Sequence, residues 1–115
     1  MPALIDSTIQ KYQACIDACI KCMQACEECL SSCLKEPDVA ARTQCITMMR
    51  DCIDICALSA QWMSRGSDHA AQLCQLCATI CDACATHCAT YQDTHCKQCA
   101  EQCKQCAEEC RKMSA

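Results

Sequence analysis

Nineteen cysteines dominate the chemistry that this chain of 115 residues could perform. Most of them recur three and four residues apart, in three dense stretches and one sparser stretch. They are Cys15, Cys19, Cys22, Cys26, Cys29, Cys33, Cys45, Cys52, Cys56, Cys74, Cys77, Cys81, Cys84, Cys88, Cys96, Cys99, Cys103, Cys106 and Cys110. Residues three and four apart share one face of an α-helix, so this spacing predicts a line of thiols along each helix. Such a line can hold soft metal ions between neighbouring sulfurs.

Cu(I) is the metal that suits this pattern best. Thiolates select Cu(I), zinc or iron–sulfur clusters. Zinc prefers closed tetrahedral sites, usually on turns, and iron–sulfur motifs gather their cysteines in loops; a thiol column along helices offers neither. Cu(I) accepts two or three sulfurs, and a sulfur can bridge two ions, so the expected capacity approaches one ion per thiol, on the order of 19. The pairs four residues apart that could each hold an ion are Cys15/Cys19, Cys22/Cys26, Cys29/Cys33, Cys52/Cys56, Cys77/Cys81, Cys84/Cys88, Cys99/Cys103 and Cys106/Cys110.

Four helices are needed to position these thiols. Pro37 and the single Gly66 mark two of the breaks between them, and a polar turn around Asp93 marks the third. The expected helices cover approximately residues 4–35, 37–64, 68–91 and 94–113. Because the breaks are short, consecutive helices should run antiparallel. We therefore predict an all-α fold: one up-down four-helix bundle that occupies residues 1–115.

Cysteine takes the place of the usual aliphatic core. The chain has no Phe and only one Trp, and its 52% hydrophobic content includes the cysteines. In each segment the cysteines occupy the inward heptad positions that Leu and Ile normally fill in a bundle. In the sparser second segment Met49, Ser59 and Met63 complete the register. The core is therefore expected to be lined with thiols. The bundle as a whole is expected to fold without metal.

The two ends of the predicted bundle differ in chemistry. One end gathers Cys33, Cys45, Cys88, Tyr91, His95 and Cys96, with His87 nearby. We expect copper to pass through this end, with His87, His95 and Met49 as possible additional ligands because imidazole and thioether bind copper. The opposite end gathers an apolar set that should close it: Ile5, Thr8, Ile9, Tyr12, Trp62, Met63, Leu73 and Met113.

Charge and N-terminal sequence indicate a cytoplasmic protein. The net charge is −4, and there is no basic stripe that would bind nucleic acid. The first residues lack the basic and apolar regions of a secretory signal, and no run is long enough to span a membrane. Thiols stay reduced in the cytoplasm, where dense cysteine patterns indicate metal or redox chemistry rather than disulfides.

The sequence resembles the bacterial copper storage protein family, specifically its cytosolic branch, whose members lack a signal sequence. The resemblance covers essentially the whole chain and rests on the repeated Cys-x₃-Cys pairs. It includes the runs CIDACIKC at 15–22, CIDICAL at 52–58 and CKQCAEEC at 103–110. It implies a four-helix bundle that assembles into homotetramers and fills its core with Cu(I). A copper chaperone or a low-molecular-weight thiol is a candidate donor of the metal.

The cysteine pattern is also compatible with other functions. The chain could be a general zinc or cadmium buffer similar to metallothionein, or a redox enzyme that uses cysteine pairs. No set of nucleophile, base and orienting residue stands out, so we predict that it is not an enzyme. An apolar row beside the thiols is expected to form a subunit interface: Ile16, Met23, Leu30, Ile46, Ile53, Ile55, Leu76 and Ile80.

Overall fold

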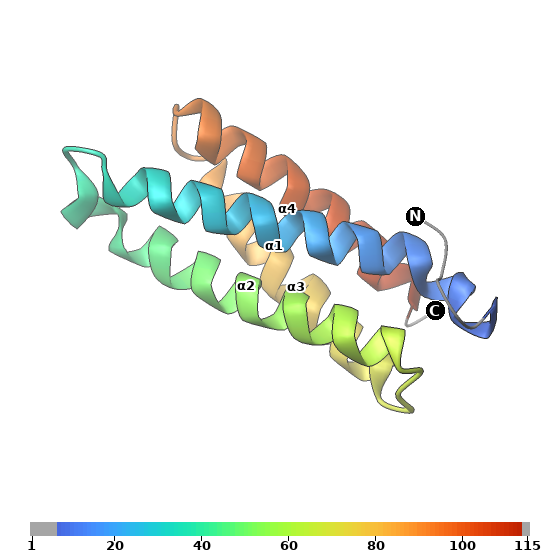
Figure 1. The fold of residues 1–115 in the computed structure, drawn as a ribbon. Helices are drawn as coiled ribbons and strands as arrows, with labels where there is room; N and C mark the ends of the chain where they lie inside the picture. The colour runs from blue at the N-terminus through green and yellow to red at the C-terminus, as the bar shows by residue number, and fades with distance from the viewer. Residues whose placement is uncertain (1–6, 114–115) are drawn as a thin grey trace.

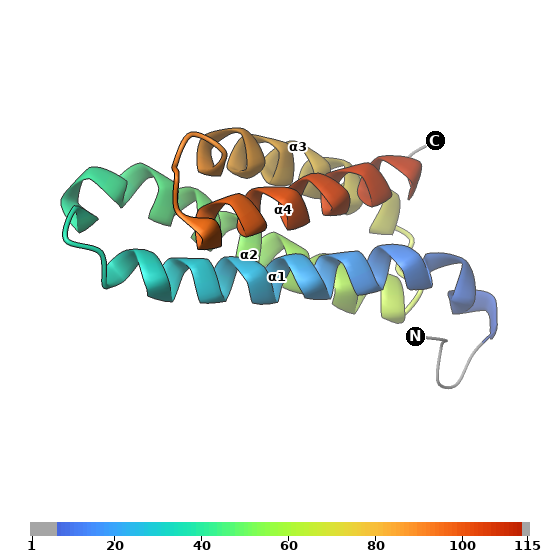
Figure 2. The same cartoon turned by 90° about the horizontal axis from the view of Figure 1, so that it is seen from above.

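The fold is an antiparallel bundle of four α-helices in a computed structural model that describes residues 7–113 (Figure 1). The helices are α1 (Gln13–Leu34), α2 (Thr43–Ser64), α3 (Ala70–Cys88) and α4 (Thr94–Met113). Helix α1 packs against α2 and α4, and α3 packs against the same two helices (Figure 2). The long axis measures 47 Å, and the other two extents are 24 and 17 Å. The predicted fold class is confirmed.

Two 3-10 helices replace the first turns of the expected helices. The helix η1 (Ser7–Tyr12) leads into α1, and η2 (Val39–Arg42) leads into α2. In the turn after Pro37, the amide of Ala41 donates to the carbonyl of Asp38 at 2.9 Å, a bond of the tight three-residue type. Helix α3 is shorter than expected, because it starts at Ala70 and ends at Cys88. The expected residues 4–6 lie outside the described part of the chain.

The turn between α2 and α3 depends on glycine. Gly66 has a φ of 67°, the only positive φ in the described residues. This conformation is open to glycine at little cost, and it lets the amide of Ser67 reach the carbonyl of Trp62 at 3.0 Å. The bond closes the end of α2 as a Schellman-type cap does, and the chain then reverses into α3.

Sulfur fills the interior of the bundle. All 19 cysteines are buried and none is in a disulfide. Besides small alanines, the buried apolar side chains are Ile16, Met49, Ile55 and Met63. The prediction that thiols form the core is confirmed. The narrow cross-section follows, because Cys and Ala are small and let the helices approach closely.

The apolar row packs in part against the core of the single chain, and its role in a subunit interface stays a prediction. Ile16 and Ile55 are buried within the single chain. Met23, Leu30, Ile46, Ile53 and Ile80 are partly buried and pack against the cysteines. Leu76 alone of this row stays half exposed, at 50%. A bundle helix needs an apolar stripe wider than one seam, and these residues provide that width.

Apolar side chains close the end of the bundle where α1 begins and α4 ends. Met63 is fully buried there, and Tyr12, Leu73 and Met113 pack against the core. The ring of Trp62 lies 6.5 Å from that of His69. Ile5 and the side chains of Thr8 and Ile9 lie outside the described part of the structure. The described residues agree with the predicted apolar closure.

Candidate metal centre

The sulfur atoms of the four helices form a continuous ladder along the bundle axis. In the middle of the bundle, the Sγ of Cys22 lies 3.6 Å from the Sγ atoms of both Cys52 and Cys103. Cys26 lies 3.6 Å from Cys99 and from Cys103 by the same measure. These contacts join α1 to α2 and α4, so each sulfur faces partners from other helices.

Contacts along each helix lie at the long end of the range of the sulfur contacts between helices. Five of the predicted pairs four residues apart have Sγ–Sγ distances of 3.8 to 4.0 Å. They are Cys52/Cys56, Cys77/Cys81, Cys84/Cys88, Cys99/Cys103 and Cys106/Cys110. The shortest contact between helices, Cys45 to Cys88, measures 3.4 Å. A metal ion can therefore be held across helices as readily as along one helix.

Four-sulfur groups overlap along the ladder. In each group, one ligand atom per residue lies within 4.8 Å of the others. The groups include Cys19/Cys56/Cys77/Cys106, Cys22/Cys52/Cys56/Cys81, Cys22/Cys26/Cys52/Cys103 and Cys26/Cys84/Cys99/Cys103. Successive groups share one or two cysteines, for example Cys56 between the first two and Cys22 with Cys52 between the next two.

This overlap decides what the ladder can hold. A metal–sulfur bond of about 2.3 Å places tetrahedral sulfurs about 3.8 Å apart, so the observed spacing accepts metal without large movements. Separate zinc sites would each take four sulfurs, so the sharing of cysteines limits how many such sites the ladder can complete. Ions that take two or three sulfurs, with sulfurs bridging between ions, can fill the whole ladder.

Burial keeps some of the core thiols protonated, whereas hydrogen bonds from Cys103 and Cys88 lower the pKa values of Cys22 and Cys45. Burial, together with the hydrogen bond to Cys33, raises the pKa of Cys96 to about 12. Hydrogen bonding to Cys99 and burial raise the pKa of Cys29 as well. Loss of water disfavours the charged thiolate, so an incoming metal ion must displace protons.

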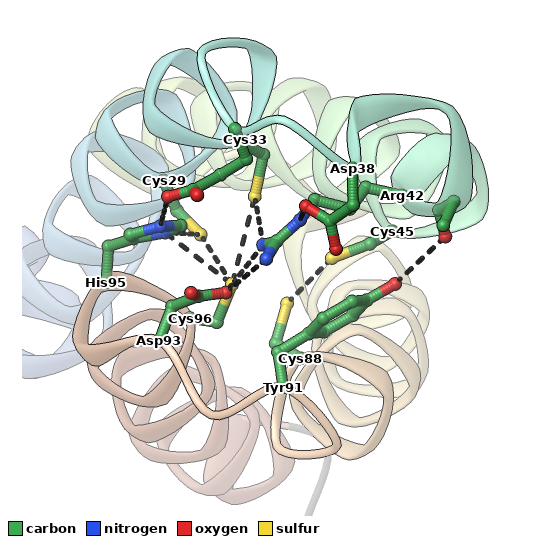
Figure 3. Close-up of polar contacts among 12 residues, drawn as sticks. Cys29, Cys33, Asp38, Arg42, Cys45, Cys88, Tyr91, Asp93, His95 and Cys96 are labelled. Atoms are coloured by element: carbon green, nitrogen blue, oxygen red, sulfur yellow. Dashed lines mark hydrogen bonds and ion pairs between the residues drawn. The ribbon is translucent and has the colours of Figure 1, made fainter.

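The end of the bundle where α1 and α3 finish, which we call the mouth, brings His95 next to cysteine side chains (Figure 3). His95 Nδ1 lies 3.4 Å from the Sγ of Cys29 and 3.5 Å from that of Cys96. These three residues and Cys33 form a further group of ligand atoms within 4.8 Å of one another. The other ring nitrogen of His95 pairs with Glu36 at 3.2 Å, which fixes the ring with Nδ1 toward the sulfurs.

Sequence reasoning missed Arg42, whose side chain contacts both charged and sulfur-bearing residues of the mouth. Its side chain is 6% exposed, and its Nη1 donates to the Sγ atoms of Cys33 and Cys96, both at 3.5 Å. Hydrogen bonds to Asp38 and Asp93 hold the pKa of Arg42 well above its usual value. Arg42 precedes Cys45 by three residues, which continues the inward register. That spacing is the signal that could have identified it.

The remaining predicted residues occupy different surroundings. Met49 is fully buried in the seam of α2, between Cys45 and Cys52 in sequence. The ring of His87 packs edge-on against Tyr91 with centroids 5.7 Å apart. Its Nε2 is buried without a hydrogen-bond partner among the described residues, as is the hydroxyl of Ser59.

Comparison with known proteins agrees with the thiol ladder. The sequence model of the copper storage protein family matches residues 8–115. The chain belongs to the copper storage protein family. The predicted resemblance is therefore confirmed.

Members of this family with solved structures share both sequence and fold with the chain. The Cu(I)-bound copper storage protein BsCsp3 is 45% identical, with a TM-score of 0.89, over 92% of this chain and 100% of that one. A cytosolic copper storage protein from Streptomyces lividans, solved with five coppers, is 38% identical with a TM-score of 0.88, over 92% and 93% of the two chains. The cysteine-rich protein YhjQ of Bacillus subtilis is 45% identical over 92% of this chain and 98% of its own length.

The structure bears on membranes in one respect. No helix within residues 7–113 is both long and apolar enough to cross a bilayer.

Proposed function

We propose that this copper storage family member takes up many Cu(I) ions per chain and stores or buffers them in the bundle core. The observation that carries the proposal is the overlap of the four-sulfur groups, which makes the core one connected set of thiols. Cu(I) fits such a set because it accepts two or three soft ligands and tolerates bridging sulfurs. The Cu(I)-bound relative with the same fold supports the choice of metal.

The proposed ligands are the 19 cysteines, with His95 as an additional ligand at the mouth. Each Cu(I) that binds replaces a thiol proton, so a core with one copper per thiolate stays electrically neutral. Neutrality matters because unpaired charge is costly in a water-free interior. His87 and Met49 are proposed as weaker contributors, since one is buried near the mouth and the other lies within the seam.

The compartment, the oligomeric state and the copper donor of the protein are also proposed. We propose a cytoplasmic, non-enzymatic protein, in keeping with the cytosolic relative from Streptomyces lividans. Homotetramer formation is proposed on the basis of the family resemblance and the exposed apolar side chains Ile20, Leu34, Leu58 and Leu76, which are 37 to 55% exposed. A copper chaperone or a low-molecular-weight thiol is the proposed donor.

A general soft-metal buffer for zinc or cadmium is the second candidate, because the sulfur spacing also accommodates tetrahedral ions. Competition separates the two functions. The reduced protein is first loaded with Zn(II), freed of unbound metal, and titrated anaerobically with Cu(I) in the presence of a zinc-sensitive dye. For a copper store, Cu(I) should displace all of the bound zinc and continue to bind afterwards. Retention of zinc in the presence of excess Cu(I) would favour the general buffer.

A further inference from the structure

The side chain of Arg42 lies in the mouth of the bundle, where Asp38, Asp93 and Tyr91 contact it (Figure 3). Its Nε donates to Asp38 at 2.8 Å, and its Nη2 pairs with Asp93 at 2.6 Å. The guanidinium carbon lies 4.8 Å from the centroid of the Tyr91 ring, a cation–π contact. Residues from the turn before η2 and from the turn between α3 and α4 thus hold the buried cation of Arg42, the last residue of η2.

The guanidinium and a metal ion need the same two sulfurs. Arg42 donates to the Sγ atoms of Cys33 and Cys96. These two sulfurs belong, with Cys29 and His95, to the ligand group closest to the mouth. An ion held between Cys33 and Cys96 would face a positive charge within hydrogen-bonding distance. The ion would need the sulfur lone pairs that accept from Nη1 and would add a second positive charge beside the guanidinium, so the two compete for these sulfurs.

We propose that Arg42 is a gate residue that competes with Cu(I) for Cys33 and Cys96 and must move out before copper passes the mouth. The inference rests on the proposed storage function. Arg42 therefore limits the rate at which copper enters or leaves the ladder. It does not set the number of ions that the inner thiols hold.

The surroundings of Arg42 allow this movement. Asp38 is 55% exposed at its side chain and Asp93 is 27% exposed, so water lies next to both partners. The long arginine side chain can turn toward solvent and keep one carboxylate as a partner. The other carboxylate would then face the mouth and attract an incoming cation. A buried arginine is uncommon unless it is paired, and here the pairing ties it directly to two metal-binding sulfurs.

The test compares the Arg42→Gln variant with a control, Arg65→Gln, in the full-length reduced protein. Arg65 is exposed at the other end of α2, far from the mouth. Each protein is loaded anaerobically with Cu(I), and the ions held are counted. The copper is then removed with an excess of the chromogenic chelator bathocuproine disulfonate while absorbance is followed by stopped flow. We expect Arg42→Gln to release copper at least tenfold faster, which corresponds to a barrier lower by about 1.4 kcal/mol. Arg65→Gln should match the parent.

Asp93→Asn provides a second variant that keeps the arginine but loosens its hold. We expect its release rate to lie between those of the parent and Arg42→Gln, and this result carries the test if Arg42→Gln does not fold. Rates in both variants within about twofold of the parent, or slower than the parent, would overturn the gate. A parent protein that holds no copper would instead refute the proposed function, so the two failures can be told apart.

Discussion

Cys52 is the sulfur whose removal tests the shared-ligand arrangement most sharply. Its Sγ lies within 4.0 Å of the sulfurs of Cys22, Cys56, Cys81 and Cys103. It also belongs to two of the four-sulfur groups. If copper and thiolate pair one to one across the ladder, Cys52→Ala should lose about one ion per chain. If each group holds its own ion through Cys52, the loss rises to about two.

The stability of the apo-protein gives an independent magnitude at the same position. Cys52 is fully buried among sulfurs, so Cys52→Ala removes one heavy atom and leaves a small cavity, at a cost of about 1 kcal/mol. Cys52→Ser keeps the volume but buries a hydroxyl that has only weak sulfur acceptors nearby, which costs about 1–3 kcal/mol. We expect the two variants to lose the same copper and to differ in their free energies of unfolding.

Native mass spectrometry of the copper-loaded proteins and urea unfolding of the apo-proteins measure the two effects. Cys45→Ala is the matched control, because its nearest sulfur contact is Cys88, at 3.4 Å, near the end of the ladder. It should lose at most about one ion. A Cys52→Ala protein that holds as much copper as the parent would refute the shared ladder. So would one that holds almost none, since the ladder would then behave as one all-or-none cluster.

Three further predictions concern single groups. Ser59→Ala should raise the free energy of urea unfolding by about 1 kcal/mol, because the buried Ser59 hydroxyl has no partner in the described structure; a lower value would contradict this. The pKa of Cys96 is raised to about 12 in the fold, against about 8.5 when unfolded. The stability it provides is therefore complete below about pH 8.5 and is lost as pH rises toward 12. The urea concentration at the unfolding midpoint of the reduced apo-protein should decrease as pH is raised from about 7.5 to about 10.5. The midpoint of the copper-loaded protein should decrease less. An equal dependence of the midpoint on pH in both forms would count against the protonated core. His95→Ala should weaken binding of the ions nearest the mouth by about tenfold, the scale of one lost ligand contact, in chelator competition at substoichiometric copper. His69→Ala serves as its control, and equal affinities would remove His95 from the ligand set.

The seam of cysteines made most of the fold predictable. The spacing of three and four residues in 15–33, 74–88 and 96–110 fixes which face of each helix points inward. The short breaks at Pro37 and Gly66 fix the antiparallel order. Both deductions use only relations between residues close in sequence, so a single sequence was enough to predict the inward face of each helix and the order of the helices. The resulting burial of every cysteine agrees with them.

Contacts between helices could not be predicted in the same way. Whether Cys22 meets Cys52 or Cys56 depends on the rotation of each helix and its shift along the axis, and neither is contained in the spacing within one helix. Arg42 was missed for a related reason. An arginine before a helix is normally a surface residue, and only the joint approach of Asp38, Asp93 and Tyr91 provides it with a buried position. Ile16 and Ile55 of the apolar row lie in the core, because the small cysteines leave room for flanking aliphatic side chains.

Anaerobic titration of the reduced apo-protein with Cu(I), against bathocuproine disulfonate in excess, tests the central claim most directly. We expect the protein to withhold more than about ten ions per chain before the chelator takes colour, approaching about one per thiol. Colour after only one or two ions would contradict the storage function and show that the connected thiols do not act as a copper store.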